Sequence, residues 1–509
     1  MIVVDKWSKV ILTSVIVIFF LLSQWIIFSV DREHWFDVSF TLETVHKLRQ
    51  DGIVSIDFQK WDVHPPVFYY LSYFWSFLNP GAGEYHWAQE LPAVLMLGFL
   101  IFVFFALRKL FGRSGELAVI GLSMCTTYLH YGTEVRTYAL LLLLSGIVFY
   151  GVVNDLKGWC GVAAMVAVFL MPLCHYFASM GVFFYAAVGM LYARKRSEFF
   201  FDAKKRYVIF IVIGLIGIAI AGFGYALSQK ERVAGTWFEP PSVLEWPSSV
   251  VYAFFVSDKF VLVGVSQMLL TLLYLFFLGL LGYCSWKTYS ILKSGVPSIR
   301  EMMLILMGSS ALVPVIGLAA IPLLGGSFAN LYHYRFFLIV TWLFAAMFFV
   351  LIADIVVQWF GQEGKGLRSV LLSVGVVLIL LTMAFGYGRS VHHELGNLMK
   401  QTPCPKGNES VIQIAHESPF SALPYEVYAR EYKCKWFNFV STRLTPMMLN
   451  GGGGDAMAGR IFFNKTLPDG DYYYVQAEKT VKVDGYQELI AVEDGVNLTF
   501  VRRNRVGDG

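Results

Sequence analysis

The chain has 509 residues, of which 57% are hydrophobic and 15% charged, and its formal net charge is +4. A soluble domain is on average about 45–50% apolar and about 25% charged, so this composition excludes an ordinary soluble protein. The apolar residues are concentrated in blocks of about 20, the length of helix that crosses about 30 Å of hydrocarbon. We therefore predict an all-α polytopic membrane protein.

About eleven blocks qualify as transmembrane helices if the chain starts in the cytoplasm. They lie near residues 10–30, 91–108, 115–133, 137–153, 159–176, 178–193, 207–227, 260–283, 302–323, 335–357 and 369–387. The first block is longer than the apolar core of a signal peptide and no small-x-small site follows it, so we expect it to be retained. An odd number of spans places the residues after about 388 on the outer side of the membrane.

The basic clusters agree with this topology. Short runs of Lys and Arg fall in the loops that would face the cytoplasm, as the positive-inside rule requires. They include Lys6 with Lys9, Arg108-Lys109 with Arg113, residues 194–196, residues 204–206, Lys287 with Lys293 and Arg300, and Lys365 with Arg368. Because these runs are short and flank helices, we expect the bilayer and no nucleic acid as partner. The predicted location is the cytoplasmic (inner) membrane.

The first outer loop, residues 31–64, carries apolar residues at helical spacings, which favours a helix lying on the membrane. The next segment, residues 65–78, is apolar and aromatic but only about 14 residues long. Counting it as a full span would invert every later helix and place residues 194–196 outside. We therefore interpret it as an interfacial or partly embedded helix.

Residues 388–509 are more polar and contain short alternating runs, for example at residues 472–475 and 480–483. This pattern predicts a small β-rich or α/β outer domain. Cys404 and Cys434 both lie in it, and an oxidising compartment would allow a disulfide between them. The other four cysteines lie in or at the ends of spans, where packing explains them.

Three acidic residues, Asp31, Glu33 and Asp37, follow the first span directly. A carboxylate there is in water yet held against the bilayer, so it can act on a lipid head group while the lipid tail stays in hydrocarbon. Such a group can serve as the general base that activates an acceptor hydroxyl. The alternative is that acids after a span are simply solvated.

His64 precedes Pro65 and Pro66. Two prolines fix φ and remove two backbone donors, so the chain enters the following helix rigidly and holds His64 at a reproducible position. Taken alone, the triplet indicates only the start of a helix.

A second motif, residues 134–138, lies at the outer mouth of the third and fourth spans and contains Glu134, Arg136 and Tyr138. The planar, permanently charged fork of arginine suits phosphate oxygens, so Arg136 is a candidate for binding a phosphate. In hydrocarbon neither charge is tolerated without a partner. A structural Glu134–Arg136 pair that ties two helices together is the alternative.

A similar motif, residues 332–335, lies at the outer mouth of a later span and contains His333 and Arg335. Arg335 is the second phosphate candidate, unless its side chain only snorkels to the interface. His175 ends the fifth span on the same side, where a polar lining and a catalytic role are equally consistent with the sequence.

Together these motifs resemble the membrane glycosyltransferases of the GT-C superfamily, and within it the group similar to dolichyl-phosphate-mannose-protein mannosyltransferases and lipid A aminoarabinose transferases. The resemblance rests on the acidic motif after the first span and on the runs at residues 64–71 and 134–140. It covers about residues 10–195 well and Tyr334-Arg335 weakly. The family usually has adjacent Asp-Glu in the first outer loop, whereas this chain has Asp31-Arg32-Glu33.

The resemblance implies a GT-C-like transmembrane catalytic domain over residues 1–387 and an extracytoplasmic domain over residues 388–509. It also implies a polyprenyl-phosphate sugar donor, an outer glycan, lipid or protein acceptor, and inversion at the anomeric carbon. In this interpretation Asp31 or Glu33 is the base, with Asp31 favoured by its position relative to the first span. The remaining roles are donor-phosphate binding by Arg136 and Arg335 and lining of the sugar site by His64 and Tyr138.

The likeness implies lipopolysaccharide, O-antigen or another envelope glycan as the product, with protein O-glycosylation as an alternative. The sequence requires no cofactor. Since oligosaccharyltransferases of related fold use a divalent metal, the acids could instead be metal ligands. An O-antigen polymerase or ligase would place its catalytic loop later in the chain. A polyprenyl-lipid flippase or other transporter would need charges near the bilayer midplane, where this chain has few.

Overall fold

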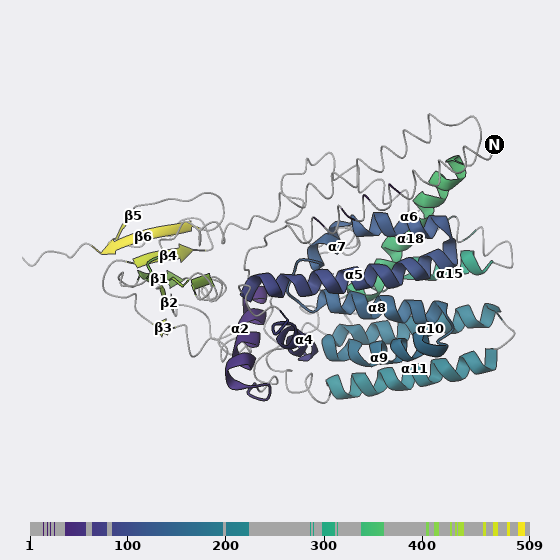
Figure 1. Cartoon of the computed structure of the whole chain (residues 1–509), viewed down its shortest axis with the longest axis horizontal. Coiled ribbons are helices and arrows are strands. Elements are labelled where there is room, and N and C mark those ends of the chain that lie inside the picture. Colours follow the sequence, from purple (N-terminus) through teal and green to yellow (C-terminus); the bar gives the residue numbers. More distant parts are fainter. Residues whose placement is uncertain are drawn as a thin grey trace, which may run out of the picture. The chain divides into compact units, whose positions relative to one another are not determined.

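We describe the fold from a computed structural model of the chain, drawn in Figure 1. It describes residues 36–56, 64–78, 84–196, 200–222, 298–310, 337–360, 404–406, 412–416, 428–429, 433–434, 436–441, 462–464, 472–476, 486–488 and 497–503, with single positions at 14, 18, 21, 25, 286, 289 and 313. The chain divides into two compact units. One comprises Met1–Val30, Pro92–Leu227 and Thr236–Ser390, and the other Asp31–Leu91, Ser228–Gly235 and Val391–Gly509.

The first unit is a bundle of helices. In chain order its described elements are α5 (Glu84–Phe111, which begins within the second unit), α6 (Arg113–Ser123), α7 (Thr126–Tyr131), α8 (Tyr138–Val153), α9 (Gly158–Cys174), the 3-10 helix η1 (Tyr176–Ala178), α10 (Ser179–Arg196), α11 (Phe200–Ala221), α15 (Ile299–Ser309) and α18 (Leu338–Phe360). In the described residues these helices overlap the apolar blocks predicted between residues 91 and 227 and those near 302 and 335.

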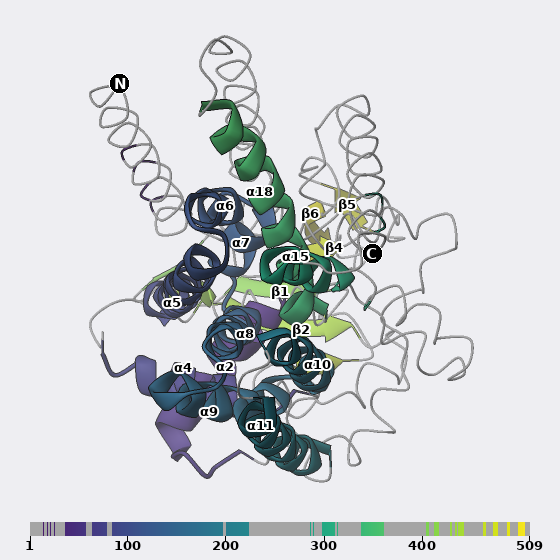
Figure 2. The ribbon, with the colours of Figure 1, turned by 90° about the vertical axis from the view of Figure 1, so that its right-hand side faces the viewer.

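Helix α8 lies at the centre of the bundle, with α5, α9 and α10 around it in Figure 2. Of its 16 residues 13 are buried. It carries no charged side chain, so it can be buried on every side at no electrostatic cost. Small residues let its neighbours approach closely: Gly146 faces Phe99 of α5, and Gly151 faces Ala164 of α9.

The outer surface of the bundle is apolar over several helices. Its exposed side chains include Val94, Ile101 and Phe105 on α5, Val162 and Val166 on α9, Phe183 and Leu191 on α10, and Val208, Ile209, Val212, Leu215, Ile216 and Ile220 on α11. Among the described residues, Glu90–Phe111 and Tyr176–Arg194 are long and apolar enough to cross a membrane, while Tyr138–Val153, Gly158–Cys174 and Leu338–Asp354 are shorter apolar helices. Apolar surface of this extent marks contact with a membrane or a partner.

The predicted span at residues 115–133 is not one continuous helix. Helix α6 ends at Ser123, Cys125 is extended (φ −64°, ψ 136°), and α7 begins at Thr126. The hydroxyl of Ser123 donates to the carbonyl of Ile120 at 2.8 Å. Such local hydrogen bonds, and the adjacent β-branched Thr126 and Thr127, compete with continuation of a helix. An apolar block alone could not reveal this break.

Basic residues join neighbouring helices at one end of the bundle. The Nζ atom of Lys109 donates to Oδ1 of Asn154 at 2.6 Å, Nε of Arg206 donates to the carbonyl of Asp155 at 2.7 Å, and Arg300 pairs with Asp354. These bonds link the end of α5 to the end of α8, the turn after α8 to the start of α11, and the start of α15 to α18. Lys109, Arg206 and Arg300, which belong to or flank predicted cytoplasmic loops, therefore lie at one end of the bundle.

In the second unit, α2 (Phe36–Asp51) packs against α4 (Val67–Trp75), with the rings of Phe40 and Tyr69 6.4 Å apart. The polar side of α2 is buried as well as its apolar side: Ser39, Thr41 and Thr44 have no exposed surface. The helix predicted in the first outer loop is present, but it is more enclosed than its amphipathic pattern indicated. Nine residues of α4 rise only about 14 Å, too little to cross a bilayer.

Six strands of the second unit form one sheet: β1 (Ile412–His416), β2 (Trp436–Ser441), β3 (Phe462–Asn464), β4 (Tyr472–Gln476), β5 (Tyr486–Glu488) and β6 (Asn497–Arg503). Their order is β3-β2-β1-β4-β6-β5. The first four are parallel to one another, and β6 runs antiparallel to both β4 and β5. The predicted run at residues 472–475 lies in β4, and the one at 480–483 lies outside the described residues.

A disulfide joins Cys404 to Cys434, with Cα atoms 4.8 Å apart, within the usual range for this bond. The amide of Cys434 donates to the carbonyl of Ala429 at 2.8 Å. Cys404 precedes β1 and Cys434 precedes β2 in the sequence. The bridge therefore ties together the two segments that lead into neighbouring strands.

Candidate active site

The loop between α7 and α8 carries two charged residues, and every residue from 131 to 142 is buried. Its backbone is held by local hydrogen bonds: Gly132 donates to the carbonyl of Tyr128 at 2.9 Å, and Arg136 donates to the carbonyl of Glu134 at 2.7 Å. The Thr133 hydroxyl donates to the carbonyl of His130 at 2.9 Å. These local bonds hold the backbone that carries Glu134 and Arg136.

Glu134 is paired with His130. The Nε2 atom of His130 lies 3.3 Å from Oε2 of Glu134, and the Glu134 side chain is only 2% exposed. The residues are four apart and span the end of α7, which brings their side chains onto one face. A buried carboxylate is stable only with such partners. The imidazole Nε2 therefore lies within ion-pair distance of a buried carboxylate oxygen.

Arg136 lies two residues further on and is 5% exposed. Its guanidinium is permanently charged and offers five N–H donors in a planar fork. Burial of this group together with Glu134 concentrates both signs of charge in one short loop. The arrangement is suited to holding an anionic group and to stabilising negative charge that develops on it.

Aromatic rings enclose the loop. The rings of Tyr131 and Tyr138 are 4.9 Å apart, and that of Tyr138 is 6.1 Å from the ring of His175. Each of these three residues is at most 3% exposed. They join the end of α7, the start of α8 and the end of α9 in one layer beside the charged loop.

The end of α9 completes this side of the site. His175 leaves the helix in an extended conformation, and its Nδ1 accepts a hydrogen bond from the amide of Phe177 at 3.3 Å. A neutral His175 therefore carries its proton on Nε2. The Thr137 hydroxyl donates to the carbonyl of Cys174 at 3.3 Å, which fastens the charged loop to α9.

The start of α18 is fixed against the same region. The hydroxyl of Tyr185 donates to the carbonyl of Ile339 at 2.8 Å and accepts from Nε1 of Trp342 at 3.0 Å. The ring of Phe177 lies 6.4 Å from that of Phe337. These contacts set the position at which α18 begins, just after the 332–335 motif in the sequence.

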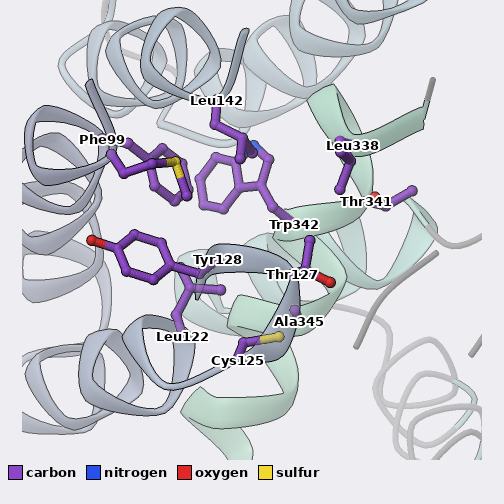
Figure 3. Close-up of a pocket in the computed structure, with 11 residues that line it drawn as sticks. Phe99, Leu122, Cys125, Thr127, Tyr128, Leu142, Leu338, Thr341, Trp342 and Ala345 are labelled. Carbon is purple, nitrogen blue, oxygen red and sulfur yellow. The ribbon is translucent and has the colours of Figure 1, made fainter. Parts of the chain in front are cut away.

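A small cavity lies beneath this layer (Figure 3), lined by residues of α5, α6, α7, α8 and α18 that include Phe99, Cys125, Thr127, Tyr128 and Trp342. The volume of this cavity is about 20 Å³, which is room for about one water molecule. It is too small for a sugar. We therefore assign it to packing and place the candidate site at the charged loop.

No protein-family model and no curated protein sequence matches the chain. Solved structures do match. ArnT from Cupriavidus metallidurans in the apo state superposes with a TM-score of 0.54 and 11% identity over 98% of each chain. The archaeal oligosaccharyltransferase AglB from Archaeoglobus fulgidus, in complex with an inhibitory peptide and a dolichol-phosphate, superposes with a TM-score of 0.50 and 11% identity over 92% of this chain and 69% of that one. Both are GT-C glycosyltransferases.

This chain has a GT-C-like fold. The predicted resemblance is thereby confirmed at the level of fold, although the sequences share little identity. Within this GT-C-like fold the structure brings four of the predicted site residues together at one end of the helix bundle: Glu134, Arg136, Tyr138 and His175.

The remaining predicted site residues belong either to the second unit or to parts of the chain outside the described residues. His64 is half-buried in the second unit, directly before α4, and Asp37 lies in the first turn of α2. The predicted bases Asp31 and Glu33, and the predicted pair His333 and Arg335, lie outside the described residues. Their roles remain predictions.

Sequence reasoning missed His130 and Tyr131. His130 stands four residues before Glu134, a spacing that could have indicated the pair if α7 had been predicted to end there. In the described part of the chain, no three His, Cys, Asp or Glu side chains gather in a way that could hold a metal ion. Of the acids considered as metal ligands, Asp31 and Glu33 lie outside the described residues.

Proposed function

We propose that this protein is an integral-membrane inverting glycosyltransferase that transfers a sugar from a polyprenyl-phosphate donor to an acceptor outside the cytoplasm. One observation carries the proposal: a buried loop with Glu134 and Arg136 lies at one end of an apolar helix bundle of GT-C-like fold. Soluble proteins have little reason to combine an apolar exterior with buried charge at a helix end.

The membrane placement follows from the two ends of the bundle. The basic residues at the ends of α5 and α10 and at the starts of α11 and α15 suit the cytoplasmic side. The 134–138 loop leads into the start of α8, whereas the residues after the other end of α8 are bonded to Lys109 and Arg206. The loop therefore faces outward in this placement. The exposed apolar side chains of α5, α9, α10 and α11 would then meet lipid. We infer the inner membrane as the location, with the N-terminus in the cytoplasm and residues 388–509 outside.

Arg136 is proposed to bind the phosphate of the donor, together with Arg335, which precedes the well-fixed start of α18. The charge on the polyprenyl phosphate grows as the bond from the anomeric carbon to the phosphate oxygen breaks. A guanidinium already in place stabilises this charge without reorganisation. Glu134 and His130 would hold the loop that carries Arg136.

The acceptor hydroxyl needs a base that takes its proton as it attacks the anomeric carbon from the face opposite the phosphate. Asp31 and Glu33 are the proposed bases, with Asp31 favoured, and His64, Tyr138 and His175 are proposed to line the sugar site. The polyprenyl phosphate leaves as the new glycosidic bond forms, which inverts the configuration. Lipopolysaccharide, O-antigen or another envelope glycan is the proposed acceptor.

The test is a transfer assay with full-length protein in nanodiscs and radiolabelled polyprenyl-phosphate sugars. Asp31→Asn, Glu33→Gln and Arg136→Lys are compared with matched controls. Asp51→Asn changes an exposed acid at the end of α2, and Arg113→Lys changes an exposed arginine at the opposite end of the bundle. Both controls should transfer sugar like the wild type.

The expected result is weakened transfer in Arg136→Lys and loss of transfer in one of the two acid variants, with both controls active. If the wild-type protein consumes no donor sugar of any kind, yet moves labelled lipid between leaflets, the proposed transferase activity is wrong. The protein is then a flippase. If transfer survives in both acid variants, the base has been assigned to the wrong residues.

A further inference from the structure

The four parallel strands of the sheet in the second unit differ sharply between their two ends. They begin with Ile412, Trp436, Phe462 and Tyr472, which are apolar or aromatic. They end with His416, Ser441, Asn464 and Gln476, which all carry hydrogen-bonding side chains. The carboxyl ends of parallel strands meet at one edge of a sheet, so the topology gathers these polar residues there.

The strand register makes this grouping more specific. Ser441 of β2 is paired with Asn464 of β3, and Gln476 of β4 is paired with Asn497, the first residue of β6. His416 is paired with Val440 and with Val475, the residues just before Ser441 and Gln476. Ser441, Asn464, Gln476 and Asn497 therefore share one row across the sheet, and His416 lies one row further in. We call these five residues the polar edge.

The polar edge includes the point where the strand order reverses. From β1 the chain proceeds to β2 and then β3 on one side, and it then crosses to β4 on the other side of β1. The connections that leave the ends of β1 and β4 therefore run in opposite directions. In open α/β sheets, ligands bind outside the carboxyl ends of the strands at such a switch point.

The residue types at the polar edge define the ligand class. Among the described strand ends of this edge, the residues are amides, a hydroxyl and an imidazole, without arginine, lysine or a carboxylate. Anionic ligands are usually held by arginine or lysine, and hard cations by carboxylates. Amide side chains both donate and accept hydrogen bonds, which matches a neutral ligand rich in hydroxyl groups.

We propose that the polar edge, centred between β1 and β4, is a binding site for a neutral carbohydrate, namely the acceptor glycan of the transfer reaction. The juxtaposition of His416, Gln476 and Asn497 with Ser441 and Asn464 at one sheet edge carries this inference. Its identification with the acceptor rests on the proposed function. The binding itself can be measured independently of transfer.

The experiment measures carbohydrate binding by full-length protein in nanodiscs with saturation-transfer difference NMR. The probes are maltotetraose, cellotetraose and the polysaccharide released by mild acid from the envelope of the native cells. The variants Gln476→Ala, Asn464→Ala and His416→Ala are each compared with Gln413→Ala, which removes the same side chain as the first variant near the opposite end of β1. The Cys404–Cys434 disulfide and the melting temperature report whether each variant is folded.

A folded wild type should bind at least one of these probes, and each edge variant should weaken binding about three- to tenfold, as expected for the loss of a side-chain hydrogen bond. Gln413→Ala should bind within about twofold of the wild type. The inference is overturned if no probe binds, or if Gln413→Ala and Gln476→Ala lose binding equally. Binding of a neutral peptide that depends on the same edge, without carbohydrate binding, would also overturn it.

Transfer activity is measured on the same preparations. Active transfer without binding at the polar edge removes this inference and leaves the proposed function in place. Carbohydrate binding that depends on the polar edge, in a protein that transfers no sugar, removes the proposed function and leaves the binding site.

Discussion

The imidazole Nε2 of His130 lies 3.3 Å from the carboxylate Oε2 of Glu134, and this contact crosses the end of α7. The pair joins the last turn of a six-residue helix to the loop that leads into α8. A helix so short has little stability of its own. The contact therefore fixes both the end of α7 and the start of the loop that carries Arg136.

Replacing Glu134 by alanine should destabilise the protein by about 1–3 kcal/mol, the cost of removing the partner of the His130 imidazole. Glu134→Gln keeps the size and an acceptor oxygen, so we expect a smaller loss. The measurement is thermal unfolding in nanodiscs. If Glu134→Ala melts at the wild-type temperature, the pair contributes nothing to stability.

Arg136→Lys should raise the KM for the donor about ten- to a hundredfold, because lysine keeps the charge and loses the planar fork that binds phosphate oxygens in pairs. The measurement is steady-state transfer at varied donor concentration, with Arg113→Lys as the control. An unchanged KM in Arg136→Lys would show that this residue does not hold the phosphate in the ground state.

Tyr185 and Trp342 should be energetically coupled. Tyr185→Phe removes the hydroxyl that accepts from Nε1 of Trp342 and donates to Ile339, at a cost of about 1–3 kcal/mol. Trp342→Phe removes the Nε1–H group that donates to the same Tyr185 hydroxyl. In a double-mutant cycle of melting temperatures, the double variant should lose less stability than the sum of the single losses. Strict additivity would contradict a shared network.

Gly217 should not tolerate a methyl group, whereas Gly222 should. A Cβ atom on Gly217 of α11 would lie 2.5 Å from the carbonyl oxygen of Phe169 on α9, and one on Gly222 would meet nothing within 4 Å. Gly217→Ala must push two helix backbones apart, which costs about 1–3 kcal/mol. Thermal unfolding of the two alanine variants provides the comparison, and equal melting temperatures would contradict the close approach of α9 and α11.

Reducing the Cys404–Cys434 disulfide should destabilise the sheet that follows it. The bridge closes a loop with a sequence separation of 30 residues, for which chain-entropy estimates give roughly 3–4 kcal/mol. Cys404→Ser should therefore make residues 404–503 more sensitive to limited proteolysis, while Cys125→Ser serves as a control in the helix bundle. Equal resistance of reduced and oxidised protein would contradict this role.

Much of the helix bundle is predictable from the sequence because apolar blocks of about 20 residues have few ways to satisfy their backbone groups in hydrocarbon. Helices α8, α9 and α10 begin and end close to the expected residues. The break at Cys125 was not predictable, since it depends on local hydrogen bonds that hydropathy does not record. The burial of the polar side of α2 also depends on which elements surround it.

Glu134 and Arg136 were recognisable in sequence as charges at the mouth of apolar spans, which are costly there without partners. The partner of Glu134 was not recognisable in sequence, because the pairing with His130 depends on where α7 ends. Likewise, His175 was expected at the end of a span, but its place beside Tyr138 follows from the packing of α9 on α8.

Sequence alone determined that this chain is built from apolar helices, because composition and block length reflect the free energy of removing apolar surface from water. It also identified charged residues, such as Glu134 and Arg136, whose placement at the mouth of apolar spans costs too much free energy without partners. Only the tertiary structure decided which of those residues meet, since His130, Glu134, Tyr138 and His175 come from three helices and a loop. The polar edge of the sheet likewise exists only in the strand order, because its residues come from separate strands that extend along the sequence from His416 of β1 to Asn497 of β6.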